Sequence, residues 1–352
     1  MNPSPQMDVV VKTIEVTEIL LNNVQTAVDM TFSSIYSEGV EFLGAAQVQE
    51  SFDGIVGIIS LVGDISCSVA IGLPRNMAGL VSKKFIGFDI DYNSEDMGDM
   101  IGELVNIAGG DLLARLDADG IKTELSLPTA TRGNPLKFLV QEKTKVMCIK
   151  FKCPDGVFWV DIALNSLSQN NAQENISNKQ SEKQERYDMV DASGGQDVKF
   201  SPEEIEGMKQ SVLKTFGSMV GEDVQFTGFT DGKEAFNGIV GIVSLVGHQQ
   251  TWSLMLGFTP ESALKIGEKF AGFEIDYDSD DMGDVIGELA NVVAGDAAAQ
   301  LYSLGIKAEL SIPTIARGRE MNMLLAKDVA KMHYSFKTRI GNFWMKLATE
   351  RH

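Results

Sequence analysis

Two pairs of an acid and an amide could carry chemistry, because the same spacing occurs twice. Glu103 precedes Asn106 by three positions, and Glu288 precedes Asn291 by three positions. Residues three apart on an α-helix are neighbours on its surface, so each pair can contact one partner together. An amide can accept a hydrogen bond from a water molecule while it donates one to an anionic oxygen. Such a group suits the positioning of water beside a phosphoryl group, a reaction that needs little covalent work from the protein.

Both pairs belong to a long internal repeat. Residues 84–133 align without a gap with residues 269–318, and 31 of these 50 positions are identical. Upstream, GIVGIISLVG at 54–63 is repeated as GIVGIVSLVG at 238–247. We conclude that the chain is a tandem duplication of a unit of about 150 residues, a length that can bury its own core.

The strongest identity predicts a helix that carries each pair. SEDMGDMIGELVNIAGGD (94–111) matches SDDMGDVIGELANVVAGD (279–296), and the serine followed by two acids predicts a capped helix start. One apolar stripe should face the core: Met97, Ile101, Leu104, Ala108 and Leu112. Around the pairs we predict partner-binding positions at Asp99, Gly102, Gly110, Asp284, Gly287 and Gly295. The alternatives are that the glycines only pack within their own domain, and that the acid and the amide are ordinary solvated surface.

The elements that must position these helices have a similar order in each unit. We expect a first helix at 17–36, with a counterpart that begins at Ser201 and Pro202, then a buried β-hairpin at 54–61 and 65–73. Further helices should begin at Pro74 and Pro260, followed by strands that end at Pro128 and Pro313 and by a last hairpin in each unit: 146–152 with 157–164, and 333–338 with 342–348. The predicted fold class is α+β, an antiparallel or mixed sheet with helices on one face.

Composition sets the domain boundaries and excludes several classes of function. The polar stretch 166–198 predicts a flexible linker between domains 1–165 and 199–352. A net charge of −19 disfavours nucleic-acid and anionic-membrane binding, and no apolar run reaches the ~20 residues of a membrane helix. Three cysteines and three histidines give no matching ligand set for a metal site. We expect a cytoplasmic protein without a metal or cofactor of its own.

The combined motifs resemble a known family. The GIVGI hairpin, the helix DMGDxIGELxNxxAGD, the strand that ends in LSLPT or LSIPT, and the Arg-Gly that follows are similar to CheX, in the CheX/CheC group of chemotaxis phosphatases. The resemblance covers nearly all of each unit. CheC-type domains carry two such Glu-x-x-Asn helices and each unit here has one, so the better match is CheX in tandem. Asp111 and Asp296 depart from the family, which often has asparagine there.

The resemblance implies a phosphatase for the phospho-aspartate of a CheY-like receiver domain. It assigns Asn106 and Asn291 to the orientation of water, Glu103 and Glu288 to the binding of a receiver lysine, and Mg²⁺ to the receiver. It also implies that the two units pair within one chain, as CheX-like proteins pair in homodimers. Two alternatives stay open: a non-catalytic module that binds receivers or other signalling proteins, and an architectural component related to flagellar switch proteins.

Overall fold

The computed structural model describes residues 5–46, 51–139, 141–165, 200–232 and 234–351. The whole of the predicted linker, 166–198, therefore lies outside the described residues. We refer to the described residues up to 165 as unit 1 and to those from 200 onward as unit 2.

The elements of unit 1, in chain order, are α1 (Pro5–Tyr36), β1 (Glu41–Ala46), β2 (Phe52–Gly63), β3 (Cys67–Pro74), α2 (Arg75–Ile86), α3 (Glu95–Ala118), β4 (Thr123–Leu125), β5 (Thr129–Leu139), β6 (Thr144–Cys153) and β7 (Gly156–Asn165). Those of unit 2 are α5 (Pro202–Thr215), the π-helical turn η1 (Phe216–Val220), β8 (Gln225–Thr230), β9 (Phe236–Val246), β10 (Gln250–Phe258), α6 (Pro260–Ala271), α7 (Asp280–Ser303), β11 (Glu309–Leu310), β12 (Thr314–Leu324), β13 (Ala330–Lys337) and β14 (Asn342–Arg351).

The strands of both units belong to one antiparallel sheet. Along the sheet the order is β1-β6-β7-β3-β2-β5-β12-β9-β10-β14-β13-β8, while β4 pairs with β2 and β11 pairs with β9. Read from either end, the order of one unit mirrors that of the other. The units meet where β5 pairs with β12, in a register that places Leu139 opposite Ile315 and Ala130 opposite Leu324. The α+β prediction is confirmed.

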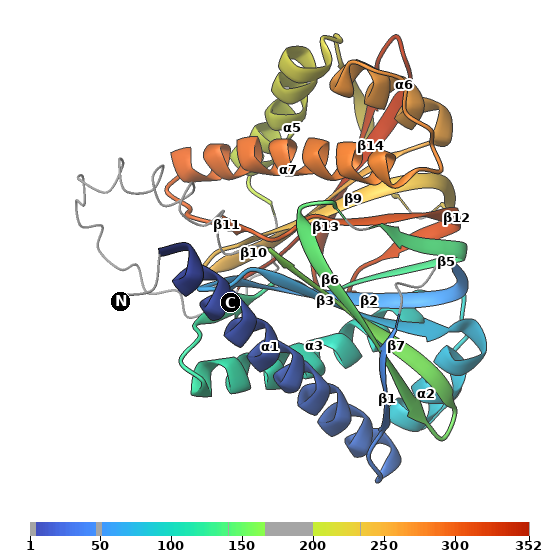
Figure 1. The fold of residues 1–352 in the computed structure, drawn as a ribbon. Coiled ribbons are helices and arrows are strands. Elements are labelled where there is room, and N and C mark those ends of the chain that lie inside the picture. Colours follow the sequence, from blue (N-terminus) through green and yellow to red (C-terminus); the bar gives the residue numbers. More distant parts are fainter. Residues whose placement is uncertain (1–4, 47–50, 140, 166–199, 233, 352) are drawn as a thin grey trace, which may run out of the picture.

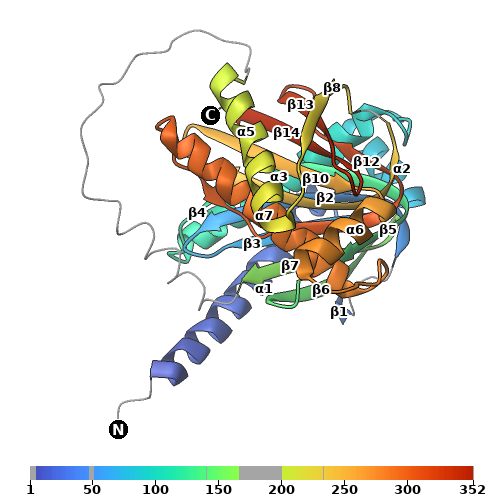
Figure 2. The ribbon, with the colours of Figure 1, turned by 90° about the horizontal axis from the view of Figure 1, so that it is seen from above.

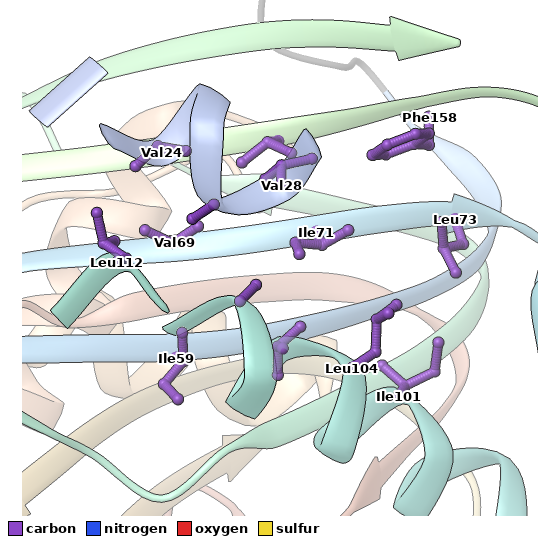
Figure 3. Packing of buried hydrophobic residues seen from close by; sticks show 14 of the residues in the cluster. Val24, Val28, Ile59, Val69, Ile71, Leu73, Ile101, Leu104, Leu112 and Phe158 are labelled. Atoms are coloured by element: carbon purple, nitrogen blue, oxygen red, sulfur yellow. The ribbon is translucent and has the colours of Figure 1, made fainter. Parts of the chain in front are cut away.

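Each unit packs its helices on one face of its own strands. In Figure 1, α1, α2 and α3 lie below the strands and α5, α6 and α7 lie above them, so that the long helices α3 and α7 are on opposite sides of the molecule. Figure 3 shows the core of unit 1, where Val24 and Val28 of α1, Val69 and Ile71 of β3, and Leu104 and Leu112 of α3 belong to one buried cluster. The first turns of α1 extend beyond the strands (Figure 2).

The opposite faces of the strands also form a core, and both units contribute to it. On β2, Ile55 and Ile59 face the helices, whereas Val56 and Ile58 belong to a separate buried cluster that also contains Val240 and Ile242 of β9. This alternation follows from the two-residue period of a strand. Strands β2 and β9 are buried on both faces, which accounts for the nearly continuous apolar runs at 54–62 and 238–246.

Several local predictions are confirmed. The hairpin of β2 and β3 pairs antiparallel, with Gly54 opposite Pro74 and Leu61 opposite Cys67. At the start of α5, Ser201 and Glu204 form a capping box, because the Ser201 hydroxyl accepts from the Glu204 N–H and the Glu204 carboxylate accepts from the Ser201 N–H.

Other local features differ from the sequence predictions. The first helix begins at Pro5 rather than at residue 17. Ser94 is the N-cap residue of α3, as predicted, but its hydroxyl donates to the carbonyl of Asp91 at 2.7 Å and accepts no N–H of the helix. The equivalent Ser279 does cap α7, because its hydroxyl accepts from the Met282 N–H. The sequence also gave no indication of the strands β1, β5, β8 and β12.

Candidate functional site

The candidate site helices are fixed by their apolar stripes. Met97, Ile101 and Leu104 are fully buried, and Leu112 is almost so, as the spacing predicted. Helix α3 lies close to β2 because Gly57 has no side chain there: a Cβ at Gly57 would meet Ile101 and Val105. Gly241 of β9 allows the same approach of α7 to Ile286 and Ala290. The backbone of each helix is therefore set by a core that leaves one face toward solvent.

A buried arginine from the next strand holds the loop before each site helix. Arg132 of β5 donates to the carbonyls of Tyr92 at 2.7 Å, Asn93 at 2.6 Å and Ser94 at 3.0 Å. Its guanidinium is 6.0 Å from the centre of the Tyr92 ring, and burial raises the pKa of Tyr92 to about 12. These three carbonyls precede the first turn of α3, so Arg132 determines where the helix begins.

Arg317 of β12 does the same for α7. It donates to the carbonyls of Tyr277, Asp278 at 2.8 Å and Ser279 at 3.1 Å. Both arginines are less than a tenth exposed. The sequence marked this position through the duplicated Arg-Gly, but its role in positioning the helix was not predicted.

The predicted Glu/Asn pairs lie on the open faces of α3 and α7. Glu103, Asn106 and Glu288 are exposed, and Asn291 is half-buried. Among the described residues, none of these four side chains has a hydrogen bond or ion pair. Ile107, next to Asn106, is 39% exposed. Each helix thus presents a carboxylate and an amide, three residues apart, whose hydrogen-bonding groups are available to a partner.

The glycines beside the pairs fall into two groups. A Cβ at Gly110 or at Gly295 would meet nothing within 4 Å, so these positions leave open space one turn after each asparagine. Gly102 and Gly287 are buried instead. A Cβ at Gly102 would approach Pro128 at 4.0 Å, and one at Gly287 would overlap the side-chain amide of Gln141 from unit 1.

The other two predicted positions, Asp99 and Asp284, contact the opposite unit. Asp99 forms an ion pair with Lys327 of unit 2 at 3.4 Å. Asp284 accepts a hydrogen bond from the backbone N–H of Glu142 of unit 1 at 2.9 Å. Burial raises the pKa of Asp284, and the acids Glu142, Asp281 and Asp280 add to this rise. Sequence reasoning missed Gln141, Glu142 and Lys327, because no motif within one unit indicates which residues the other unit brings to it.

The two aspartates that depart from the family pattern have contacts within their own units. Asp111 forms an ion pair with Arg115 at 2.6 Å. Asp296 accepts a hydrogen bond from the Thr215 hydroxyl at 2.9 Å and forms an ion pair with Lys214. Asp296 therefore connects α7 to α5, whereas Asp111 stays within α3.

Two surveys of the described residues concern other kinds of site. Within the part of the chain that the structure describes, no three His, Cys, Asp or Glu side chains are grouped as metal ligands would be, and the buried residues Cys67, Cys148 and Cys153 are not in disulfides. None of the described helices combines the length and the apolar character that crossing a membrane requires.

Comparison with known proteins gives one family. The model of the family described as chemotaxis phosphatase CheX matches residues 55–152 and 239–337, which together make up more than half of the chain. Each match contains one of the site helices. A search of curated protein sequences gave no match.

Several solved structures match a part of this chain, and each match covers nearly all of the solved chain. A CheC-like superfamily protein from Shewanella sp. PV-4 is 22% identical, with a TM-score of 0.41, and the match covers 43% of this chain and 99% of that chain. A chemotaxis protein CheX from Desulfovibrio desulfuricans is 20% identical, with a TM-score of 0.39 and coverage of 42% and 99%. CheX in the CheX–CheY–BeF3–Mg²⁺ complex from Borrelia burgdorferi is 17% identical, with a TM-score of 0.34 and coverage of 42% and 97%.

Proposed function

The chain belongs to the CheX family, and from this premise we propose that it hydrolyses the phospho-aspartate of a CheY-like receiver domain in chemotaxis or related two-component signalling. The observation that carries the proposal is the Glu/Asn pair on the open face of both α3 and α7, whose side chains have no hydrogen bond or ion pair among the described residues. Such a pair on a rigid helix is available to a docked protein. The proposal places the chain in the cytoplasm, with the receiver as its partner.

In this reaction the asparagine orients the water. Its carbonyl oxygen accepts a hydrogen bond from the water molecule, and its NH2 group donates to a phosphoryl oxygen. The water oxygen attacks phosphorus, the bond between phosphorus and the aspartyl oxygen breaks, and the products are the free carboxylate and inorganic phosphate, which also takes the proton from the water. An amide has no basicity for this step, so its contribution is orientation.

The glutamate has a different task. A carboxylate beside a phosphoryl group is repelled by it, which disfavours Glu103 and Glu288 as bases acting on the water. A carboxylate at this position instead attracts a positive group of the receiver, and we assign both glutamates to that contact. Magnesium, in this proposal, is carried by the receiver, and this chain supplies no metal ligand.

The first test removes the amides. Asn106→Ala together with Asn291→Ala is expected to abolish the acceleration of phosphate release from phosphorylated receivers of the same genome, while binding of BeF3⁻-activated receiver persists. The matched control is Asn237→Ala, because Glu234 and Asn237 have the same spacing but lie at the entrance of β9, where Asn237 accepts from the Glu320 N–H. Wild-type turnover by the double variant on every receiver that responds to the parent would refute the assignment.

The second test reverses the charge of the acids. Glu103→Lys with Glu288→Lys should weaken receiver binding about tenfold or more at low salt, because a positive side chain repels the group that the carboxylate attracts. Fluorescence anisotropy with a labelled, BeF3⁻-activated receiver measures this loss. If binding were unchanged while turnover fell, the glutamates would act on the phosphoryl group rather than in docking. If the parent bound receivers without accelerating phosphate release, the chain would be a non-catalytic binding module.

We also propose that β5 and β12 pair within one chain in solution. Tethering raises the effective concentration of one unit at the other to the millimolar range, which favours this pairing over pairing between chains. Light scattering should give a mass of 38.3 kDa for the intact chain at micromolar concentration. Residues 1–165 and 199–352, expressed separately, should each associate. A dimeric intact chain with strictly monomeric separate units would contradict this pairing.

A further inference from the structure

Each site helix is bordered by a short segment of the opposite unit. After β5, Gln141 and Glu142 contact α7, and after β12, Lys327 contacts α3. The two segments occupy equivalent places in the internal repeat, since residues 84–133 align with 269–318 at the same offset of 185. Glu142 thus corresponds to Lys327, and Gln141 to Ala326. The two borders differ in the sign of their charge.

At α3 the border is positive. The ammonium group of Lys327 forms ion pairs with Asp96 and, at 3.4 Å, with Asp99. The hydrogen bond to Asp96 raises the pKa of Lys327, so this group is charged at neutral pH. Asp99 lies one helical turn before Glu103, so the positive charge is adjacent to the candidate site and offsets its acids.

At α7 the border is negative. The Glu142 backbone contacts Asp284, one turn before Glu288, and the Glu142 side chain is exposed. The side-chain amide of Gln141 lies against Gly287, which directly precedes Glu288. Burial is the main cause of the raised pKa of Asp284. The hydrogen bond from the Glu142 N–H lowers this pKa, whereas the negative charges of Glu142, Asp281 and Asp280 raise it.

Other charges do not cancel this difference. Lys137 forms an ion pair with Asp280 at 3.2 Å, but Asp280 is eight residues before Glu288, about 12 Å along the helix. At the next position of each segment the sign of the charge is the opposite: Lys143 follows Glu142, and Asp328 follows Lys327. Both are exposed, and among the described residues neither has an ion pair with α3 or α7.

From these contacts we propose that Glu142 and Lys327 are specificity-determining residues that make the two sites unequal. The site on α7, bordered by Gln141 and Glu142, binds an activated receiver more tightly than the site on α3. The inference rests on the proposed function, in which the receiver presents a positive group to Glu103 or Glu288. A nearby negative charge strengthens that contact and a positive charge weakens it, and charges at the rim of an interface act mainly through salt-dependent association.

The test observes both sites in the intact chain. Ile107 adjoins Asn106 and Val292 adjoins Asn291, so methyl-labelled isoleucine and valine provide one NMR reporter for each site. The labelled chain is titrated with unlabelled, BeF3⁻-activated CheY-like receivers of the same genome. At 50 mM NaCl the Val292 signals should respond at about two- to tenfold lower receiver concentration than the Ile107 signal, and at 500 mM NaCl the difference should shrink to less than twofold.

Charge variants then assign the difference to the two residues. Glu142→Lys combined with Lys327→Glu should reverse the order of the two sites, and Glu142→Gln with Lys327→Gln should bring them close together. The matched control is Lys143→Gln with Asp328→Asn, one position further along the same segments, which should leave the original order unchanged. An altered backbone would shift the reporter signals before any receiver is added, so a misfolded variant is recognised directly.

Each outcome decides between the two proposals. This inference is overturned if both sites bind receiver at the same concentration, if the site on α3 binds first, or if Glu142→Lys with Lys327→Glu leaves the order of the sites unchanged. These results would count against it even if the chain accelerates phosphate release. If α7 fills first but no receiver loses phosphate faster, the inference holds and the catalytic proposal fails. If none of the receivers perturbs either reporter, both proposals are contradicted.

Discussion

The side chains at one pair of equivalent positions, Asp161 in β7 and Lys346 in β14, carry opposite charges and differ in their hydrogen bonds. Lys346 of β14 is buried and donates to the Met323 carbonyl at 2.8 Å. Asp161 occupies the same place in β7, opposite Ala70 of β3, and its Oδ1 is buried without a hydrogen-bond partner among the described residues. A small cavity of about 40 Å³ adjoins Asp161 and is lined by both units, including Phe138 and Pro313. A methionine, Met255, stands where unit 1 has Ala70.

This comparison shows where the two copies have diverged. Features that position a site helix within its unit are the same in both, as with Arg132 and Arg317 or with Gly57 and Gly241. Other features differ: Asp161 and Lys346 and the crossing segments lie where the units face each other, whereas Asp111 and Asp296 have different contacts within their own units. The residues that position the site helices are thus shared, while the surfaces between the units are complementary in different ways.

The largest expected effect concerns the shared framework. Arg132→Ala should lower the free energy of unfolding by about 4 kcal/mol, because it removes the charged donor of three hydrogen bonds to the loop before α3. Arg317→Ala should lower the free energy of unfolding by a similar amount if the arginine has the same role in both units. Urea unfolding followed by circular dichroism measures both. The control Arg115→Ala removes a half-exposed ion pair and should cost less than about 1 kcal/mol. A difference of more than 2 kcal/mol between the two buried arginines would end the claim of an equivalent framework.

The next effect concerns the apolar residues that cross between units. Leu139 of β5 packs into the core of unit 2 above Gly283, and Leu324 of β12 packs into the core of unit 1 above Gly98. Leu139→Ala and Leu324→Ala should each cost about 3 kcal/mol of unfolding free energy, because each leaves a cavity in the core of the other unit. Thermal unfolding should remain a single transition in both variants. Separate transitions in the parent would show that the two cores do not unfold together.

The smallest effect is a pH dependence that belongs to unit 1 alone. Burial raises the pKa of Asp161 to about 6, above its ordinary value of 3.8. The folded state therefore prefers the protonated acid, and its stability falls as the pH rises through this range. Between pH 5.5 and pH 8 the parent should lose about 1 kcal/mol relative to Asp161→Asn, which stays neutral. Urea unfolding at the two pH values measures the difference, and parallel stabilities of parent and variant would contradict it.

The site helices could be predicted from the sequence, whereas part of the sheet could not. The stripe from Met97 to Leu112 and the duplicated pair identified α3 and α7 because helical spacing is a local signal. Strand β5 was missed because Gly133, Asn134 and Pro135 suggest a turn in its middle. In the structure these three residues fall in the gap of the ladder between β5 and β12, which resumes on either side of them.

Contacts between the units have no local signal. Nothing near Glu142 or Lys327 in the sequence indicates that they approach α7 and α3, since both contacts join residues more than 140 positions apart. The edge strand β1 is also weakly marked, because the side chains of Glu41 to Ala46 are exposed or half-buried. Such an edge strand shows little alternation between buried and exposed residues.

Joining two units in one chain also changes what a single substitution can do. In a homodimer, one altered codon changes both copies of a border, because each subunit supplies the same segment to the other. Here the segment after β5 borders only α7, and the segment after β12 borders only α3. Every molecule therefore has one α7 border and one α3 border. The association of separate chains cannot change this one-to-one ratio. The continuous ladder between β5 and β12 thus allows the two sites to be inherited together and to change separately.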